Sequence, residues 1–256
     1  RLGFAKLDFH DFSEFSPLML EYCQRDVELT RKLAQNLELE KKKFSNQCYD
    51  LERDIRIILD KQQKNGFAFD LMKAQLLLAK LEDEQHELER HAEEEFEPTI
   101  VELKTKTKKI PFNIASRKQI ADRLMERGWE PTKLTDKGNV IVNEDVLSKI
   151  KMPEAQMFSR YFLLQKRTGL LKAWIKECGE DMRVRGRVLT LKTITGRMAH
   201  HSPNMAQVPA VYSPYGKECR ELWTVSNTQT HQLVGTDASG LELRCLAHYM
   251  RDADFT

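Results

Sequence analysis

The stretch HQLVGTDASGLELR, residues 231–244, changes its pattern in the middle. Residues 231–236 have the composition of a short β-strand, and the apolar spacing after Gly240 predicts a helix over residues 241–250. An acid at the end of a buried strand, followed by a tight turn, suits a divalent cation, because the strand fixes the carboxylate and turn carbonyls add oxygen ligands. We therefore expect a strand, a turn and a helix, with Asp237 as a candidate ligand for Mg²⁺.

The same turn also has a purely structural interpretation. Residues Ser239 to Glu242 match the Ser-x-x-Glu capping box, which begins many helices. Asp237 is in addition a common type of turn residue, because its short side chain bonds the nearby backbone. The residues alone leave the metal site and the structural turn both open.

A second candidate site precedes this stretch, in the polar loop over residues 195–209. It combines the guanidinium of Arg197 with the carboxamides of Asn204 and Gln207. Such donors match the acceptors that every base pair presents in the minor groove of DNA. The alternative is an ordered loop in which the Asn and Gln side chains bond their own backbone.

A third candidate lies near the start of the chain. Tyr22 and Asp26 are four residues apart on a predicted helix, so they share one face. A carboxylate and a phenol on one face can bind a metal ion and orient a water molecule. The other interpretation is an ordinary surface pair.

Helical patterns dominate the first two thirds of the chain. We predict an extended link over residues 67–70 and a short strand over 140–142. After Gly179 the sequence alternates arginine with apolar residues over 182–194, which predicts strands with one basic face. The expected fold class is α+β and predominantly helical. The predicted helices cover residues 16–40, 50–65, 71–96, 116–127, 144–150, 154–177 and 241–250.

Composition excludes several classes of protein. The 256 residues carry 41 Lys and Arg against 39 Asp and Glu, and 41% are hydrophobic, which is too apolar for a disordered chain. No apolar run reaches the ~18 residues of a membrane span. The five cysteines are scattered, which argues against a disulfide framework and a cysteine zinc site and favours a reducing, cytoplasmic compartment. The chain begins with Arg1, and we expect it to be a piece of a longer protein.

The residues of these candidate sites resemble the motifs of a known family. Asp237-Ala-Ser-Gly-Leu-Glu-Leu-Arg244 resembles motif A of the family A DNA polymerases, the group of bacterial DNA polymerase I and the T-odd phages. Residues 195–209 resemble the preceding motif, although Gln207 stands where many members carry Asn. Residues 112–138 resemble the thumb, and Tyr22-Cys-Gln-Arg-Asp26 resembles the third motif of the 3′-5′ proofreading exonuclease.

The resemblance implies three regions. Residues 1–45 would be the C-terminal end of an RNase H-like 3′-5′ exonuclease domain, contributing its last helix. Residues 46–180 would be a helical thumb. Residues 181–256 would be the N-terminal part of a palm with an antiparallel sheet.

The resemblance also implies roles for residues of the polymerase site. Asp237 would be one of two carboxylates that hold two Mg²⁺ ions, and the carbonyl of Ala238 would be a further ligand. Ser239, Gly240, Leu241 and Glu242 would line the nucleotide, with Glu242 helping to exclude a 2′-hydroxyl group.

Other roles implied by the resemblance concern DNA and proofreading. Arg197, Asn204 and Gln207 would enter the minor groove near the primer terminus, where acceptors common to correct pairs allow pair shape to be tested. Lys166 and Arg167 would contact phosphates. In the exonuclease site Asp26 would be a metal ligand and Tyr22 would position the attacking water.

The implied partners are primer–template DNA and deoxynucleoside triphosphates, in a bacterial cytoplasm and with a phage as the source. Residues 98–111 are too few for the thioredoxin-binding insertion of some phage relatives, so we expect no thioredoxin partner, and no membrane. Other essential acids of the family would lie before Arg1 and after Thr256, so the chain alone is expected neither to polymerise nor to proofread. The alternative is a non-catalytic DNA-binding half of a split polymerase, completed by a C-terminal half.

Overall fold

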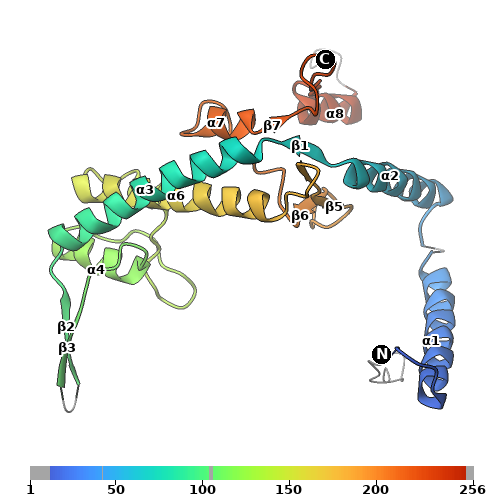
Figure 1. Cartoon of the computed structure of the whole chain (residues 1–256), viewed down its shortest axis with the longest axis horizontal. Coiled ribbons are helices and arrows are strands. Elements are labelled where there is room, and N and C mark those ends of the chain that lie inside the picture. Colours follow the sequence, from blue (N-terminus) through green and yellow to red (C-terminus); the bar gives the residue numbers. More distant parts are fainter. Residues whose placement is uncertain (1–11, 42, 104–105, 252–256) are drawn as a thin grey trace. The chain divides into compact units, whose positions relative to one another are not determined.

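Residues 12–41, 43–103 and 106–251 are described by the computed structural model of the chain (Figure 1). The backbone divides into two compact units. The first contains residues 1–62 and 190–198, and the second contains residues 63–189 and 199–256. Within the described ranges, no helix combines the length and apolar character needed to cross a bilayer.

Two long helices make up most of the first unit. Helix α1 spans Pro17–Lys41, and the Ser16 hydroxyl accepts the backbone N–H of Met19 at 3.1 Å at its start. This confirms the helix predicted over residues 16–40. Helix α2 spans Asn46–Asn65 and begins earlier than the predicted residue 50, because Ser45 caps it by accepting the N–H of Cys48 at 3.3 Å.

A small sheet and two long helices form the first core of the second unit. Strand β1 (Phe67–Phe69) lies between β4 (Arg183–Val184) and β7 (Trp223–Thr224), and both pairings are antiparallel. Helix α3 (Leu71–Glu95) follows β1 at once, because the Asp70 carboxylate accepts the N–H of Lys73 at 3.0 Å. It packs along α6 (Pro153–Lys176), as Figure 1 shows. The buried side chains here include Leu77, Leu81, Leu164, Leu171, Trp174 and Val184.

A second core lies around the short helices α4 (Arg117–Glu126) and α5 (Glu144–Leu147). Three buried rings, Phe96, Phe112 and Phe158, meet there with centroids 4.5–5.9 Å apart. Ser116 caps helix α4 by accepting the N–H of Gln119 with its hydroxyl, and the helix predicted over residues 116–127 is confirmed. Two members of this core, Ala121 and Val142, also line the groove beside α4 that is described in the next section.

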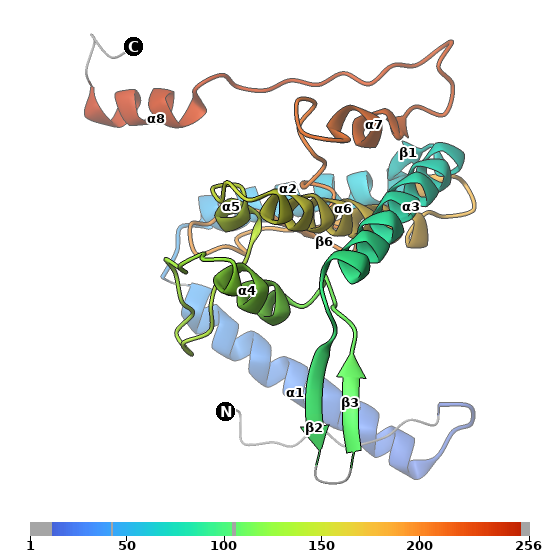
Figure 2. The ribbon, with the colours of Figure 1, turned by 90° about the vertical axis from the view of Figure 1, so that its left-hand side faces the viewer.

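The sequence patterns did not predict the hairpin formed by β2 (Thr99–Leu103) and β3 (Lys106–Ile110). Its antiparallel register runs from Thr99 opposite Ile110 to Leu103 opposite Lys106. Figure 2 shows the two strands as a ribbon that continues from the end of α3. The alternation of lysine with threonine in the sequence here is a period of two, which is typical of a strand.

The remaining elements belong to the predicted α+β part. Strand β5 (Arg187–Leu189) pairs with β6 (Ala199–His201), and the short helix α7 (Gly216–Glu221) precedes β7. With β4, these strands confirm the extended structure predicted within residues 182–194. Helix α8 (Leu241–Met250) has the predicted bounds.

The strand predicted over residues 231–236 is wrong. These residues are extended but exposed, and none belongs to a described strand. A strand is stable only when a neighbour accepts and donates its backbone hydrogen bonds, and residues 231–236 have no described strand beside them. The fold class is nevertheless the predicted one, α+β and predominantly helical with small antiparallel sheets.

Candidate functional site

The turn before α8 places the candidate metal ligand on an exposed stretch. Gly240 caps the helix in the left-handed conformation, at φ 60°, and makes no side-chain capping bond. The capping box proposed for Ser239 to Glu242 is therefore not formed. Instead, Arg244 ties the turn down by donating from Nε to the Ser239 carbonyl at 2.9 Å. Asp237, three residues before the cap, is exposed.

The donor chemistry of this turn fits a hard divalent cation. A carboxylate from Asp237 and a peptide carbonyl from Ala238 are the oxygen ligands that Mg²⁺ and Ca²⁺ take in proteins. Within the described part of the chain, no three His, Cys, Asp or Glu side chains gather closely enough to hold a metal ion. Asp237 therefore belongs to no such cluster among the described residues.

The loop over residues 203–209 is held at both ends. The indole N–H of Trp174 donates to the Asn204 carbonyl at 3.4 Å, and Arg220 donates from Nε to the Pro209 carbonyl at 2.8 Å. Between them, the Met205 sulfur accepts the backbone N–H of Gly186 at 3.2 Å. This loop is an ordered part of the second unit.

The side chains of Asn204 and Gln207 are placed differently in this loop. The Asn204 side-chain oxygen accepts the N–H of Ala206 at 3.0 Å. For Asn204, the loop therefore has the structural role given above as the alternative, in which the side chain bonds the local backbone. That bond identifies the oxygen and leaves the amide NH₂ as the donor of this half-buried side chain. Gln207 is exposed.

Arg197 lies in the first unit, in a turn of its own. Its carbonyl accepts the Thr193 N–H at 3.3 Å and the Thr193 hydroxyl at 3.0 Å. Gly196 has a φ of 77° in this turn, a conformation that favours glycine. The turn presents Arg197 as an exposed side chain.

Lys166 and Arg167 are neighbours on α6 with opposite surroundings. Lys166 is exposed, whereas Arg167 retains only 6% of its accessible surface. The Arg167 guanidinium donates to the Pro214 carbonyl at 3.2 Å and to the Ser213 hydroxyl at 3.4 Å. Nε and one terminal nitrogen of Arg167 are thus engaged inside the protein, and its phosphate contact stays a prediction.

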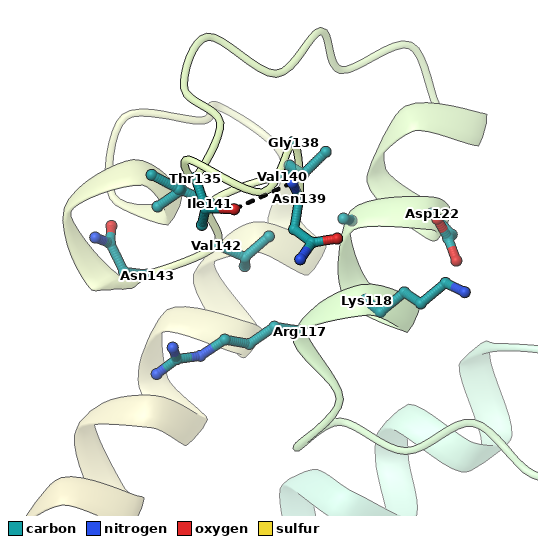
Figure 3. A pocket seen from close by; sticks show the side chains of 11 residues that line it. Arg117, Lys118, Asp122, Thr135, Gly138, Asn139, Val140, Ile141, Val142 and Asn143 are labelled. Carbon is teal, nitrogen blue, oxygen red and sulfur yellow. Dashed lines mark hydrogen bonds between the residues drawn. The ribbon is translucent and has the colours of Figure 1, made fainter.

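A groove beside α4 brings together groups that the sequence analysis did not single out. It has a volume of about 640 Å³. Arg117 and Lys118 line it from the first turn of α4, and Figure 3 shows their side chains extending in opposite directions. The N–H of Asn139, which also lines the groove, donates to the Thr135 hydroxyl at 3.1 Å. Two adjacent basic residues at a predicted helix start were the available signal. The lining also includes Asp122, Val140, Ile141, Val142 and Asn143.

On α1 the pair Tyr22 and Asp26 lies four residues apart, and both side chains are half-buried. The Tyr22 ring meets the Phe12 ring edge to face, with centroids 5.7 Å apart. The backbone carbonyl of Asp26 accepts the Thr30 hydroxyl at 2.8 Å.

The sequence analysis also missed a polar cluster that joins α3, α6 and the start of α7. The Tyr215 hydroxyl donates to Glu84 Oε1 at 2.5 Å, and Arg160 donates to Glu84 Oε2 at 2.7 Å. Burial, and then the bond to Glu84, raises the pKa of Tyr215 to about 12. Partial burial by itself raises the pKa of Glu84, but the hydrogen bonds from Tyr215 and Arg160 outweigh it and lower that pKa overall.

Comparison with known proteins places these features in a family. The sequence pattern described as DNA polymerase family A matches residues 78–256 of the chain. The chain belongs to DNA polymerase family A. The match includes the 203–209 loop, the turn before α8 and the α4 groove.

Two curated members from phages match nearly the whole chain. The DNA-directed DNA polymerases of Enterobacteria phage T3 and Escherichia phage T7 are each 29% identical to it over 346 residues, covering 98% of the chain and 49% of the relative. DNA polymerase I of Helicobacter pylori is 29% identical over 212 residues, or 80% of the chain and 21% of the relative. The chain thus spans about half the length of the phage relatives it matches.

A solved structure of similar fold is the POL domain of Pol1 from M. smegmatis, in complex with DNA primer-template and dNTP. It superposes with a TM-score of 0.61 over 77% of this chain and 33% of that one, at 20% identity. This likeness confirms the fold class. The resemblance to family A polymerases in the sequence motifs is also confirmed.

Proposed function

We propose that the chain serves template-directed DNA synthesis, in which deoxynucleotides are added to a primer 3′-hydroxyl group. The observation that carries the proposal is the turn before α8. It sets the exposed carboxylate of Asp237 three residues ahead of a glycine-capped helix, in a member of DNA polymerase family A.

In this proposal Asp237 and the Ala238 carbonyl hold Mg²⁺. When bound, two such ions would activate the primer 3′-hydroxyl group as a nucleophile and would stabilise the negative charge on the leaving group. The protein's own part is to keep the carboxylate in place, which the Arg244 bond to the Ser239 carbonyl does. Ser239, Gly240 and Leu241 line the incoming nucleotide, and Glu242, in the first turn of α8, faces its sugar.

The primer–template is held by two kinds of contact. Arg197, Gln207 and the NH₂ group of Asn204 donate to minor-groove acceptors, which all correct base pairs share. Lys166 and the α4 groove, through Arg117 and Lys118, bind backbone phosphates without regard to sequence. The Pol1 neighbour, solved with DNA primer-template and dNTP, supports this choice of partners.

The finer assignments of regions are also proposals. We assign residues 1–45 to the end of an exonuclease domain, where Asp26 binds metal and Tyr22 orients water, 46–180 to the thumb and 181–256 to the palm. No thioredoxin partner is proposed. In support, strands β2 and β3 account for most of the positions 98–111. The phage relatives align over 346 residues although this chain has 256, so they carry extra residues in the matched region.

A primer-extension assay with Mg²⁺ and deoxynucleotides, carried out with the full-length polymerase that contains this chain, tests the proposal. Asp237→Ala removes the metal ligand, so extension should fall by at least about 1,000-fold, by the scale of lost metal and electrostatic catalysis. Primer–template binding should stay within about twofold, since phosphate contacts carry most of the affinity. The control is Glu180→Ala, which removes an exposed acid of no assigned role. Wild-type extension by Asp237→Ala overturns the assignment.

A second candidate function is a DNA-binding half that works with a partner polypeptide. It is favoured by the exposed apolar side chains of residues 233–250, which include Leu233, Val234, Leu241, Leu243, Leu246, Tyr249 and Met250. Two-metal chemistry needs a second carboxylate, which the partner would supply. Extension that appears only when a C-terminal polymerase half is added selects this candidate, and extension by the chain alone excludes it.

A further inference from the structure

Three hydrogen-bond donors form one stripe along α6. Arg160, Arg167 and Trp174 are spaced seven residues apart, close to two helical turns, so they lie on the same side of the helix. All three donate to one segment of the chain, residues 204–215. Each of these contacts spans at least 30 positions of sequence, so all three are tertiary contacts and not local capping or turn bonds.

The contacts follow the segment from one end to the other. Trp174 donates to the Asn204 carbonyl at 3.4 Å, at the start of the loop. Arg167 donates to the Pro214 carbonyl at 3.2 Å, and Arg160 to the Tyr215 hydroxyl at 2.5 Å. The loop with Asn204 and Gln207 is therefore attached to α6 at the residue where it begins and again just after it ends.

The middle of the stripe is the most unusual member. Arg167 and Thr168 are the buried polar or charged side chains among the described residues, and Arg167 donates to a carbonyl and a hydroxyl, both uncharged acceptors. An apolar side chain would fill such a place without desolvating a charge. A buried guanidinium at this position is explained if its function is to make these two hydrogen bonds.

We propose that Arg167 is a positioning residue, which, with Arg160 and Trp174, fixes the 203–209 loop so that Asn204 and Gln207 meet the minor groove of the primer–template. The proposal rests on the proposed function for its DNA part. It goes beyond that function because it makes α6 the element that sets the geometry of the loop. Lys166, next to Arg167 on this helix, is exposed to solvent. Arg167 itself contacts no DNA in this proposal.

Hydrogen exchange of the loop tests the positioning in the protein alone. Arg167→Met keeps most of the side-chain volume and removes both bonds. We expect the N–H of Ala206 to exchange about tenfold faster in this variant, since local opening controls exchange in such segments. Unchanged exchange of residues 203–209 in Arg167→Met overturns the proposal.

Two further variants separate positioning from a loss of the whole fold. Ser213→Ala removes an acceptor from the loop side and leaves the α6 core intact, so it should speed exchange of residues 203–209 in the same direction. Lys176→Ala removes an exposed positive charge from the same helix and should change nothing. Equal exchange in Ser213→Ala and wild type counts against the proposal even where Arg167→Met unfolds.

DNA binding provides the second readout. A primer terminus with 3-deazaguanine lacks the minor-groove N3 acceptor, so wild type should bind it about tenfold more weakly than guanine. In Arg167→Met this penalty should become smaller, because Asn204 and Gln207 lose their placement and only the Arg197 contact is left, while the salt dependence of binding stays unchanged. An equal penalty in both proteins overturns the positioning role. No penalty in wild type, together with altered loop exchange in the variant, rejects the minor-groove contact of the proposed function and keeps the positioning of the loop.

Discussion

The hydroxyl of Tyr215 donates to Glu84 across 131 positions of sequence, at 2.5 Å. Arg160 completes the cluster from α6, and its guanidinium carbon also lies 5.0 Å from the centre of the Tyr215 ring. One residue at the start of α7 is thereby bonded to both long helices of the second unit. The segment that precedes it carries Asn204 and Gln207, so the cluster links the helical core to the candidate DNA contact.

Removing this hydroxyl should destabilise the second unit. Tyr215→Phe keeps the ring and deletes the donor, which leaves the half-buried Glu84 with Arg160 alone. We expect a loss of about 1.5–3 kcal/mol, the usual contribution of a hydrogen bond to a charged group. Urea unfolding followed by circular dichroism measures it, and Tyr212→Phe, at an exposed position, is the matched control. A variant as stable as wild type would show that the bond contributes nothing.

The same pair predicts how stability depends on pH. The pKa of Glu84 is lowered in the folded chain, so its contribution is present above the unfolded value of 4.5 and is lost as the pH falls through the folded pKa. The pKa of Tyr215 is raised to about 12, so its contribution is present below the unfolded value of 10.0 and is lost as the pH rises towards 12. The stability difference between wild type and Tyr215→Phe should be largest between these limits. A difference that is constant from acid to alkaline pH contradicts the coupling.

Two glycines should respond to alanine with opposite signs. A Cβ at Gly216 would run into the backbone carbonyl of Ala210, whereas a Cβ at Gly169, within α6, meets nothing within 4 Å. Gly216→Ala should therefore cost about 2–3 kcal/mol through overpacking. Gly169→Ala should stabilise the protein by about 0.5–1 kcal/mol, because it favours the helix. Denaturant midpoints of the two variants decide this, and a stabilised Gly216→Ala would refute the close approach.

Local signals explain which elements the sequence predicted. The starts of α3 and α4 were predictable because Asp70 and Ser116 cap them, and a cap depends on the next three residues only. Residues 231–236 and the burial of Arg167 were not predictable in the same way. The first depends on whether another strand lies alongside, and the second on a loop 46–47 positions away in the sequence.

Glu242 should control the choice of sugar. It lies in the first turn of α8, five residues after Asp237, and we assign it to the side of the nucleotide that carries the 2′ position. Glu242→Ala should reduce the preference for deoxynucleotides over ribonucleotides by about tenfold or more, since losing one discriminating contact costs about 1–3 kcal/mol. The measurement is the ratio of kcat/KM for the two nucleotides in primer extension. A lower rate with an unchanged ratio would instead indicate a role in metal or primer placement.

The α4 groove should contribute to DNA binding through charge alone. Arg117→Ala and Lys118→Ala each remove one cation from it, so each should lower the slope of log Kd against log salt by about one and weaken binding to all sequences alike. Lys176→Ala removes the same charge from the exposed end of α6 and should leave the slope unchanged. Fluorescence anisotropy with two duplexes of different sequence gives both quantities. A slope that stays constant in the groove variants would mean that the phosphates bind elsewhere. A change for one duplex alone would mean that Arg117 or Lys118 reads bases.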